Sequence, residues 1–275
     1  MKHNTEIDFI HKLTLELLDE FSKLCENAGV EYFLSGGTLL GAVRHQGFIP
    51  WDDDADIMML RDDYMKLLKI QKNYLDTRQY QILSVNDNTY PRDFARFVRK
   101  DYIKTDDCVE DNICPYVGID IFPVDFVPSN KIIFELLYQF LSFFKRLMGV
   151  YGSKKNTGVT KTTRFLRNMF RPVVSLIGGY RLARIVQIIE LTSNRLCNKS
   201  VAALSGINGR KEKWEYKDYL PKKKLKFEGL YFNCPLNYDI YLKNLYGDYM
   251  KIPPENKRIT HGIVIMKQKK TIAGI

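Results

Sequence analysis

Four carboxylates stand close together in this chain, because Asp52, Asp53, Asp54 and Asp56 fill four of five consecutive positions. Like charges at this spacing repel one another, and the repulsion grows as water is removed. The apolar residues that follow, 57–60, predict that the run leads into a buried strand. An acidic run that enters a buried strand calls for a neutralising cation, so the sequence suggests a metal site.

Strand geometry distinguishes among these acids. Side chains of a strand alternate between its two faces, so Asp54 and Asp56 should point the same way, about 7 Å apart. Such oxygen-only ligands favour Mg²⁺ or Mn²⁺ over zinc. Asp52 shares their face, and we expect it to support the two ligands without binding the metal itself.

A third acid, Asp120, lies within the apolar segment 118–123. A carboxylate inside a buried strand is costly unless it is paired or bound to a metal. Alternatively, Asp120 could pair with an arginine. Because the chain also contains the acidic run, we favour a role for Asp120 as a metal ligand or catalytic carboxylate.

A glycine turn at Ser35-Gly36-Gly37-Thr38 stands between a predicted strand and a predicted helix. Glycines there let backbone N–H groups approach a phosphate, and a helix N-terminus favours the anion. Together with the three acids, this turn is typical of metal-assisted phosphoryl or nucleotidyl transfer.

Four further residues could reach the phosphates or act as acid or base. Arg44 and His45 follow the turn, and Arg44 is a candidate phosphate ligand, although a solvated helix end is the alternative. Arg258 and His261 could approach the site from the C-terminal part, or cap local structure instead.

The periodicity predicts an α+β fold around one mixed sheet. We expect residues 1–275 to form a single catalytic domain. The predicted helices are 6–28, 39–44 and 61–75, and the predicted strands are 30–35, 52–60, 80–85, 94–98 and 117–122.

Residues 131–210 differ from the rest, and their helical periodicity predicts a basic helical insertion or subdomain. The chain has 42 Lys and Arg against 32 Asp and Glu, a formal net charge of +10. Ten basic residues and no acid lie in 136–189, so this segment carries the whole excess. Such a segment suits phosphate groups, including those of an anionic membrane surface. The ten are Lys145, Arg146, Lys154, Lys155, Lys161, Arg164, Arg167, Arg171, Arg181 and Arg184.

Neither a signal peptide nor an uncharged apolar run of about 18 residues is evident. The five cysteines are odd in number and widely spaced, which indicates free thiols. We therefore expect a cytoplasmic protein, which could lie peripherally at the inner face of the membrane.

Three blocks of this sequence resemble the signature of the LicD family, to which the fukutin-related transferases are similar. The first runs from Tyr32 to Ile57 and contains both the glycine turn and the acidic run. The second is 118–125, and the third is 246–250 followed by Pro253-Pro254, Lys257-Arg258 and His261. The blocks keep the family's order, although 131–210 matches least.

The resemblance implies a nucleotidyltransferase-like fold and transfer of a phospho-alcohol from a CDP-linked donor. In bacteria this is typically phosphocholine from CDP-choline, delivered to a sugar hydroxyl of a cell-surface glycan, lipopolysaccharide or teichoic-acid precursor. The acceptor is commonly lipid-linked. The family's glycine turn corresponds to Gly36 and Gly37, its paired acids to Asp54 and Asp56, and its third acid to Asp120.

Two other function classes remain open from the residues alone. The Asp54–Asp56 pair could serve a glycosyltransferase that binds a nucleotide-sugar. The basic sequence pI, about 9.2, could indicate a nucleic-acid-binding module, but that function leaves the buried acids unexplained. We therefore expect no nucleic-acid partner.

Overall fold

The computed structural model describes residues 2–105, 113–155, 160–206, 208–258 and 264–267. Within them, eight strands form one mixed sheet whose central path runs β1-β2-β5-β4-β10. β2 and β5 are parallel, and the other pairs are antiparallel. The strands are β1 (Phe33–Leu34), β2 (Asp56–Leu60), β3 (Tyr80–Leu83), β4 (Ala95–Thr105), β5 (Tyr116–Val127), β6 (Ser200–Ala202), β7 (Trp214–Glu215) and β10 (Val264–Lys267).

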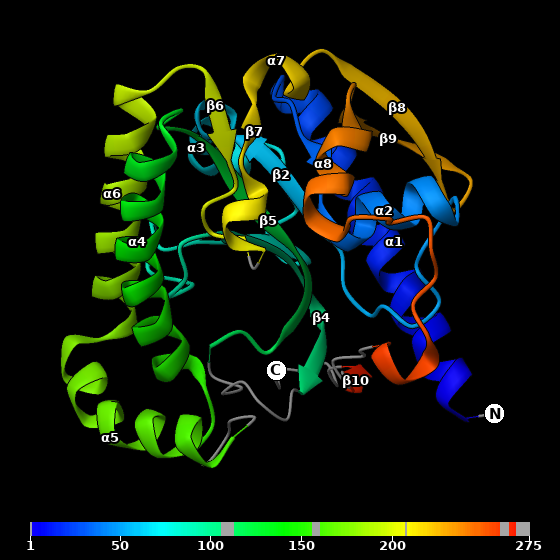
Figure 1. Cartoon of the computed structure of the whole chain (residues 1–275). Coiled ribbons are helices and arrows are strands. Elements are labelled where there is room, and N and C mark those ends of the chain that lie inside the picture. The colour runs from blue at the N-terminus through cyan, green and yellow to red at the C-terminus, as the bar shows by residue number, and fades with distance from the viewer. Residues whose placement is uncertain (1, 106–112, 156–159, 207, 259–263, 268–275) are drawn as a thin grey trace.

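Helices flank this sheet, which confirms the α+β prediction (Figure 1). The N-terminal helix α1 (Lys2–Ala28) buries Leu17, Phe21 and Leu24 in the core that it shares with β2 and β5. Gly29 follows the last residue of the helix, and its φ of +60° suits a glycine at that position. The short helix α2 (Gly36–Arg44) leads from β1 towards β2, and α3 (Arg61–Ile70) follows β2 directly.

A second helical group covers another part of the sheet. It consists of α4 (Lys131–Gly152), α5 (Lys161–Ile177) and α6 (Gly179–Leu196), all within the segment predicted to be helical. α4 packs against α6, and α6 packs against β5. Figure 1 shows α4 and α6 running side by side, with α5 crossing near one end of them.

The C-terminal part returns to short elements. The hairpin β8 (Lys222–Phe227) and β9 (Leu230–Pro235) forms a separate two-stranded sheet. Helix α7 (Tyr216–Tyr219) precedes it, and α8 (Tyr238–Tyr246) follows it and packs against α2.

Several boundaries differ from the sequence prediction. β2 begins at Asp56, so Asp54 precedes the strand instead of lying in it. β5 and β4 extend well beyond the predicted 117–122 and 94–98. The extension of β5 has a tertiary cause, because the strand pairs with β2 and β4 in its first part and with β6 near its end.

Among the described residues, no single helix is long and apolar enough to cross a membrane. One helix pair, α5 with α6, passes the same test of length and composition, but the two helices meet at an angle of 83°.

Candidate active site

The parallel pairing of β2 with β5 brings two of the predicted acids together. Asp56 stands opposite Asp120, and on the other side of β5 Arg96 of β4 stands opposite Asp120. These three residues therefore form a row across neighbouring strands. The backbone secures the register, since the Asp120 N–H donates to the Ala55 carbonyl over 3.1 Å.

Asp54 joins Asp56 and Asp120 from the segment that precedes β2. All three acids line one cavity of about 160 Å³, together with Ser35 and Gly36. The structure thus brings together the acidic pair, the third acid and the start of the glycine turn.

The glycine turn forms the first turn of α2. Gly36 has a φ of +50°, and a methyl group on it would lie 3.2 Å from Oδ2 of Asp56. A methyl group on Gly37 would lie 2.7 Å from Oδ2 of Asp52. The positive φ favours glycine at Gly36, and at both positions a carboxylate lies close to the backbone and would have to shift to admit a methyl group. Asp52 therefore lies beside the helix N-terminus, near the acids that it was predicted to support.

The two hydroxyls of the turn have positioning contacts. Thr38 Oγ1 accepts a hydrogen bond of 2.8 Å from the Asp56 N–H, and so holds the start of β2 against α2. Ser35 Oγ lies 3.0 Å from the Tyr241 hydroxyl, and it also lines the cavity. Of the four turn residues, Ser35 and Gly36 line the cavity, whereas Gly37 and Thr38 do not.

The carboxylates in this cavity repel one another strongly. Burial, and then the neighbouring carboxylates Asp54 and Asp120, raise the pKa of Asp56 well above its ordinary value. The Nε atom of Arg96 lies 3.2 Å from Asp120 Oδ1, and the Arg96 charge also interacts with that of Asp54. The arginine pairing considered for Asp120 is therefore present.

A divalent cation fits the chemistry of these ligands. The Asp120 Oδ1 atom is buried and has no hydrogen-bond partner among the described residues, and the Asp56 carboxylate faces other carboxylates. As the side chains stand in the described ranges, no three His, Cys, Asp or Glu side chains are close enough to hold a metal ion. A metal bound here would require these side chains to move closer together.

The cavity also contains residues that the sequence analysis missed. Glu212 lies on its wall, 3 % exposed, and burial raises the pKa of its carboxyl. Glu212 accepts hydrogen bonds from Tyr241 (3.0 Å) and from Asn208 (3.0 Å), so a polar chain runs from Glu212 through Tyr241 to Ser35. The sequence offered no signal for Glu212, because its position in the cavity follows from tertiary packing.

The four secondary candidates lie outside the cavity wall or beyond the described residues. Arg44 donates to the Tyr249 carbonyl over 2.9 Å and to His45 over 2.9 Å, so it ties α2 to the C-terminal part. Burial and the Arg44 charge lower the pKa of His45. Arg258 lies over the ring of Trp51, 4.4 Å from its centroid, next to the acidic run. His261 lies outside the described residues, and the roles of all four stay predictions.

Comparisons with known proteins agree with this geometry. A family model described as LicD/FKTN/FKRP, nucleotidyltransferase domain, matches residues 29–145, which include the glycine turn and all three acids. The lipopolysaccharide cholinephosphotransferase LicD of Haemophilus influenzae is 28% identical over 256 residues, 90% of this chain and 93% of that protein. The ribitol 5-phosphate transferase FKRP of Homo sapiens is 55% identical over 38 residues, 14% of this chain and 8% of that protein.

The similarity to the Haemophilus enzyme thus spans nearly the whole of both chains, and the family model covers the glycine turn and the three acids of the cavity. The chain is therefore similar to the LicD family along nearly its whole length and is a phosphotransferase.

Proposed function

We propose that this protein transfers phosphocholine from CDP-choline to a sugar hydroxyl of a cell-surface glycan, such as lipopolysaccharide or a teichoic-acid precursor. The observation that carries the proposal is the cavity in which Asp54, Asp56 and Asp120 meet the start of α2. The choice of alcohol rests on the cholinephosphotransferase, whose similarity covers 93% of its length. Ribitol phosphate is the second candidate, on the shorter match to FKRP.

The start of α2 is suited to hold the donor's phosphates. The first N–H groups of a helix lack partners within the helix and attract anions. Gly36, which lines the cavity, leaves room for the backbone to come close to a ligand. A cavity of about 160 Å³ is smaller than the range for whole small-molecule ligands, so it would enclose the reacting phosphates while the nucleoside extends beyond it.

Asp54, Asp56 and Asp120 would hold Mg²⁺ or Mn²⁺, because oxygen ligands suit these hard ions. Such an ion, when bound, neutralises phosphate charge in the transition state and polarises the reacting oxygens. It would also relieve the mutual repulsion that raises the pKa of Asp56. Ser35 and the Tyr241–Glu212 pair hold the wall opposite these acids in place.

The reaction exchanges a phosphoanhydride bond of the donor for a phosphodiester bond to the acceptor. The acceptor hydroxyl attacks the phosphorus of the phosphocholine group, a new P–O bond forms, and the bond to the bridging oxygen breaks. CMP leaves with that electron pair. The hydroxyl proton passes to a carboxylate of the cavity, and Asp120 is our candidate because it comes from a separate strand, β5, and lines the same cavity as the Asp54–Asp56 pair.

A thermal-shift screen of the whole chain tests the donor. CDP-choline, CDP-glycerol, CDP-ribitol, UDP-sugars and CTP are compared with and without Mg²⁺, since a ligand that binds the native state raises the unfolding temperature. We expect the largest shift with CDP-choline and Mg²⁺. A larger shift with a UDP-sugar would instead favour a nucleotide-sugar glycosyltransferase, and a larger shift with CDP-ribitol would change the alcohol.

We also propose that the α4–α6 group lies against an anionic membrane surface, where a lipid-linked acceptor would be found. α5 exposes Phe165, Met169, Val173 and Leu176 on one side, with Leu176 85% exposed. α4 exposes a comparable row at positions 132, 136, 140 and 143. Exposed apolar side chains in and beside the acid-free stretch 136–189 suit a lipid interface, where each basic residue contributes roughly 1 kcal/mol.

Flotation with vesicles tests this surface. We expect the chain to float with vesicles rich in phosphatidylglycerol at low salt, and to remain in the load fraction with vesicles of phosphatidylcholine alone. If no protein floats with the anionic vesicles, the membrane proposal is wrong, whatever the donor proves to be.

A further inference from the structure

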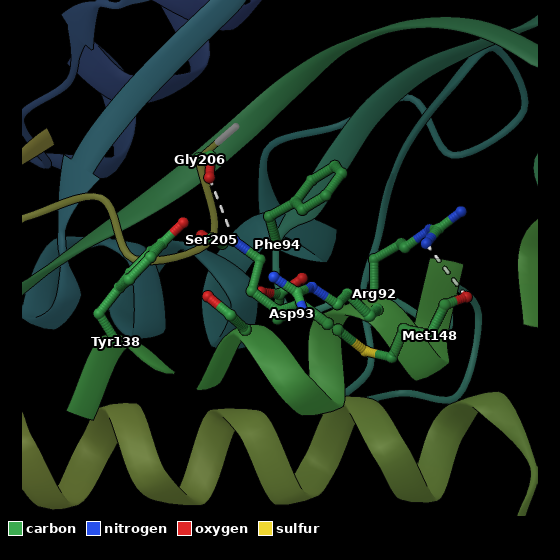
Figure 2. Close-up of a pocket in the computed structure, with 10 residues that line it drawn as sticks. Arg92, Asp93, Phe94, Tyr138, Met148, Ser205 and Gly206 are labelled. Atoms are coloured by element: carbon green, nitrogen blue, oxygen red, sulfur yellow. Dashed lines mark hydrogen bonds between the residues drawn. The ribbon is translucent and has the colours of Figure 1, made fainter. Parts of the chain in front are cut away.

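A second cavity, of about 370 Å³, adjoins the one that holds the acids. Phe94, Ser205 and Gly206 line both cavities, so these residues form a shared wall. The remaining lining comes from α4 and from the segment before β4. Figure 2 shows Tyr138, Ser205 and Gly206 towards one side of this cavity and Arg92 towards the other, with Phe94 and Asp93 between them.

The charge of the second cavity is opposite to that of the first. Arg92, Lys145 and Arg146 line it, against a single carboxyl, that of Asp93. Arg92 and Lys145 both act on the Asp93 charge, and burial raises the pKa of that carboxyl. The first cavity, by contrast, has four carboxyl groups on its wall, with Glu212 as the fourth.

Ser205 supplies independent evidence that a ligand belongs here. The residue is 4% exposed, and its Oγ has no hydrogen-bond partner among the described residues. A buried hydroxyl without a partner costs free energy unless a ligand or water completes it. Because Ser205 lines both cavities, its hydroxyl stands where a substrate spanning them would pass.

Lys145 of α4 also lines the basic cavity. Its ammonium donates to the carbonyls of Leu204 (2.7 Å) and Gly206 (3.1 Å), so α4 holds the Ser205 loop in place. An ammonium has three donor hydrogens, and two carbonyl contacts leave one of them for a ligand. Arg146, the next residue of α4, is exposed and lines the same cavity.

We propose that this basic cavity binds an anionic group of the acceptor, and that this group is a phosphate. The proposal rests on the proposed function, because it assigns the first cavity to the donor's phosphates at the start of α2. The basic cavity lies across Phe94 and Ser205 from the acids, and its wall contains no residue of α2. An acceptor could thus place its hydroxyl at Asp120 while its phosphate rests between Arg92 and Arg146.

Calorimetric titration of inorganic phosphate into the intact chain tests this assignment. Saturating CDP is present, so that the nucleotide occupies the α2 site, and ionic strength is held constant. We expect phosphate still to bind. Arg146→Gln should weaken that binding about fivefold, and Ser205→Ala about tenfold, as for the loss of one hydrogen bond to a charged ligand.

Arg195→Gln is the matched control, because Arg195 is also exposed but lies on α6 and outside both cavities. It should bind phosphate like the native chain. Equal binding in Arg146→Gln, Ser205→Ala and Arg195→Gln would refute the site. Complete loss of phosphate binding under CDP would assign the anion to the donor instead.

The two proposals fail in different ways. If CDP itself does not bind, the proposed function is wrong. The phosphate titration is then repeated without CDP, and the same three variants still decide whether the basic cavity binds an anion.

Discussion

At the scale of single residues, the chemistry depends on carboxylates that the fold forces together. Asp56 lies opposite Asp120 in the parallel β2–β5 pair, and Asp54 reaches the same cavity from the segment before β2. Burial, and then the neighbouring carboxylates, raise the pKa of Asp56, so the charged form is disfavoured here. Residues kept at such a cost are good candidates for function, because stability alone would favour their replacement.

We expect Asp56→Asn to lower transfer activity by at least about 10³-fold, as the loss of a group that acts on the transition state would do. Its unfolding temperature should stay the same or rise, since one repelling charge is removed. Asp62→Asn, at an exposed acid of α3, removes the same charge and should keep full activity. Product formation from CDP-choline and thermal unfolding measure the two effects, and an active Asp56→Asn variant would contradict the proposed mechanism.

The backbone at Gly36 allows a second test. Gly36→Ala introduces a side chain at a φ of +50° and 3.2 Å from Asp56 Oδ2. We expect a loss of about 1 kcal/mol in unfolding free energy from the backbone strain and a large loss of transfer. Gly229→Ala is the control, because Gly229 also has a positive φ, +82°, but nothing lies within 4 Å of its added methyl group. If the Gly36→Ala and Gly229→Ala variants are equally active, Gly36 matters only for the backbone conformation and not for transfer.

At the scale of elements, one buried ion cluster joins the sheet to the helical group. Arg61 at the start of α3 donates to Asp125 of β5 over 2.8 and 2.5 Å and to Glu190 of α6 over 2.8 Å. Arg61 is 2% exposed, and the two acids are fully buried. Burial raises the pKa of Glu190 even beside Arg61. The cluster therefore makes the position of α6 depend on all three partners.

Arg61→Met should destabilise the chain by about 3–5 kcal/mol, because it leaves two buried carboxylates without their cation. Adding Glu190→Gln to this variant should restore part of the loss, since one unpaired charge is removed. Urea unfolding followed by circular dichroism measures both. If the Arg61→Met variant unfolds at the same urea concentration as the unchanged chain, the cluster does not hold α6 in place.

At the scale of the whole molecule, charge and apolar surface are distributed unevenly. The acids gather in one cavity, cations line the adjoining cavity, and the α4–α6 group exposes apolar rows. This arrangement suits an enzyme whose donor binds beside the interior strands β2 and β5 while its acceptor arrives from a lipid surface. α5 contributes much of this exposed apolar surface, since Val174 is the one residue that it buries among its described positions.

We expect the double variant Met169→Glu/Leu176→Glu to lose flotation with anionic vesicles, because two carboxylates would enter the proposed lipid-facing side of α5. Its activity on a water-soluble acceptor should be unchanged. Leu236→Glu, at an apolar residue 44% exposed after β9, is the control and should float normally. Unaltered flotation of the double variant would place the membrane contact elsewhere.

Some features of the site could be predicted from sequence because they are local. Asp54 and Asp56 are close neighbours in the acidic run, and both line the cavity, although Asp54 precedes β2 and does not lie in the strand as alternation assumed. A glycine pair before a helix indicates a turn that can approach phosphate, and a single acid in an apolar strand demands a partner. The same local patterns predicted the mixed sheet and the helical character of 131–210. Each of these rests on neighbours in the chain, which the sequence contains directly.

Only the tertiary structure decided the long-range parts. The β4–β5 register, set by pairing over many residues, is what places Arg96 opposite Asp120. Glu212 lines the acidic cavity and Tyr241 donates a hydrogen bond to Glu212, and both residues are about 90 or more positions along the chain from Asp120. The basic cavity exists because α4 packs beside the Ser205 loop. Sequence spacing cannot specify such contacts, because they depend on how distant elements share one core.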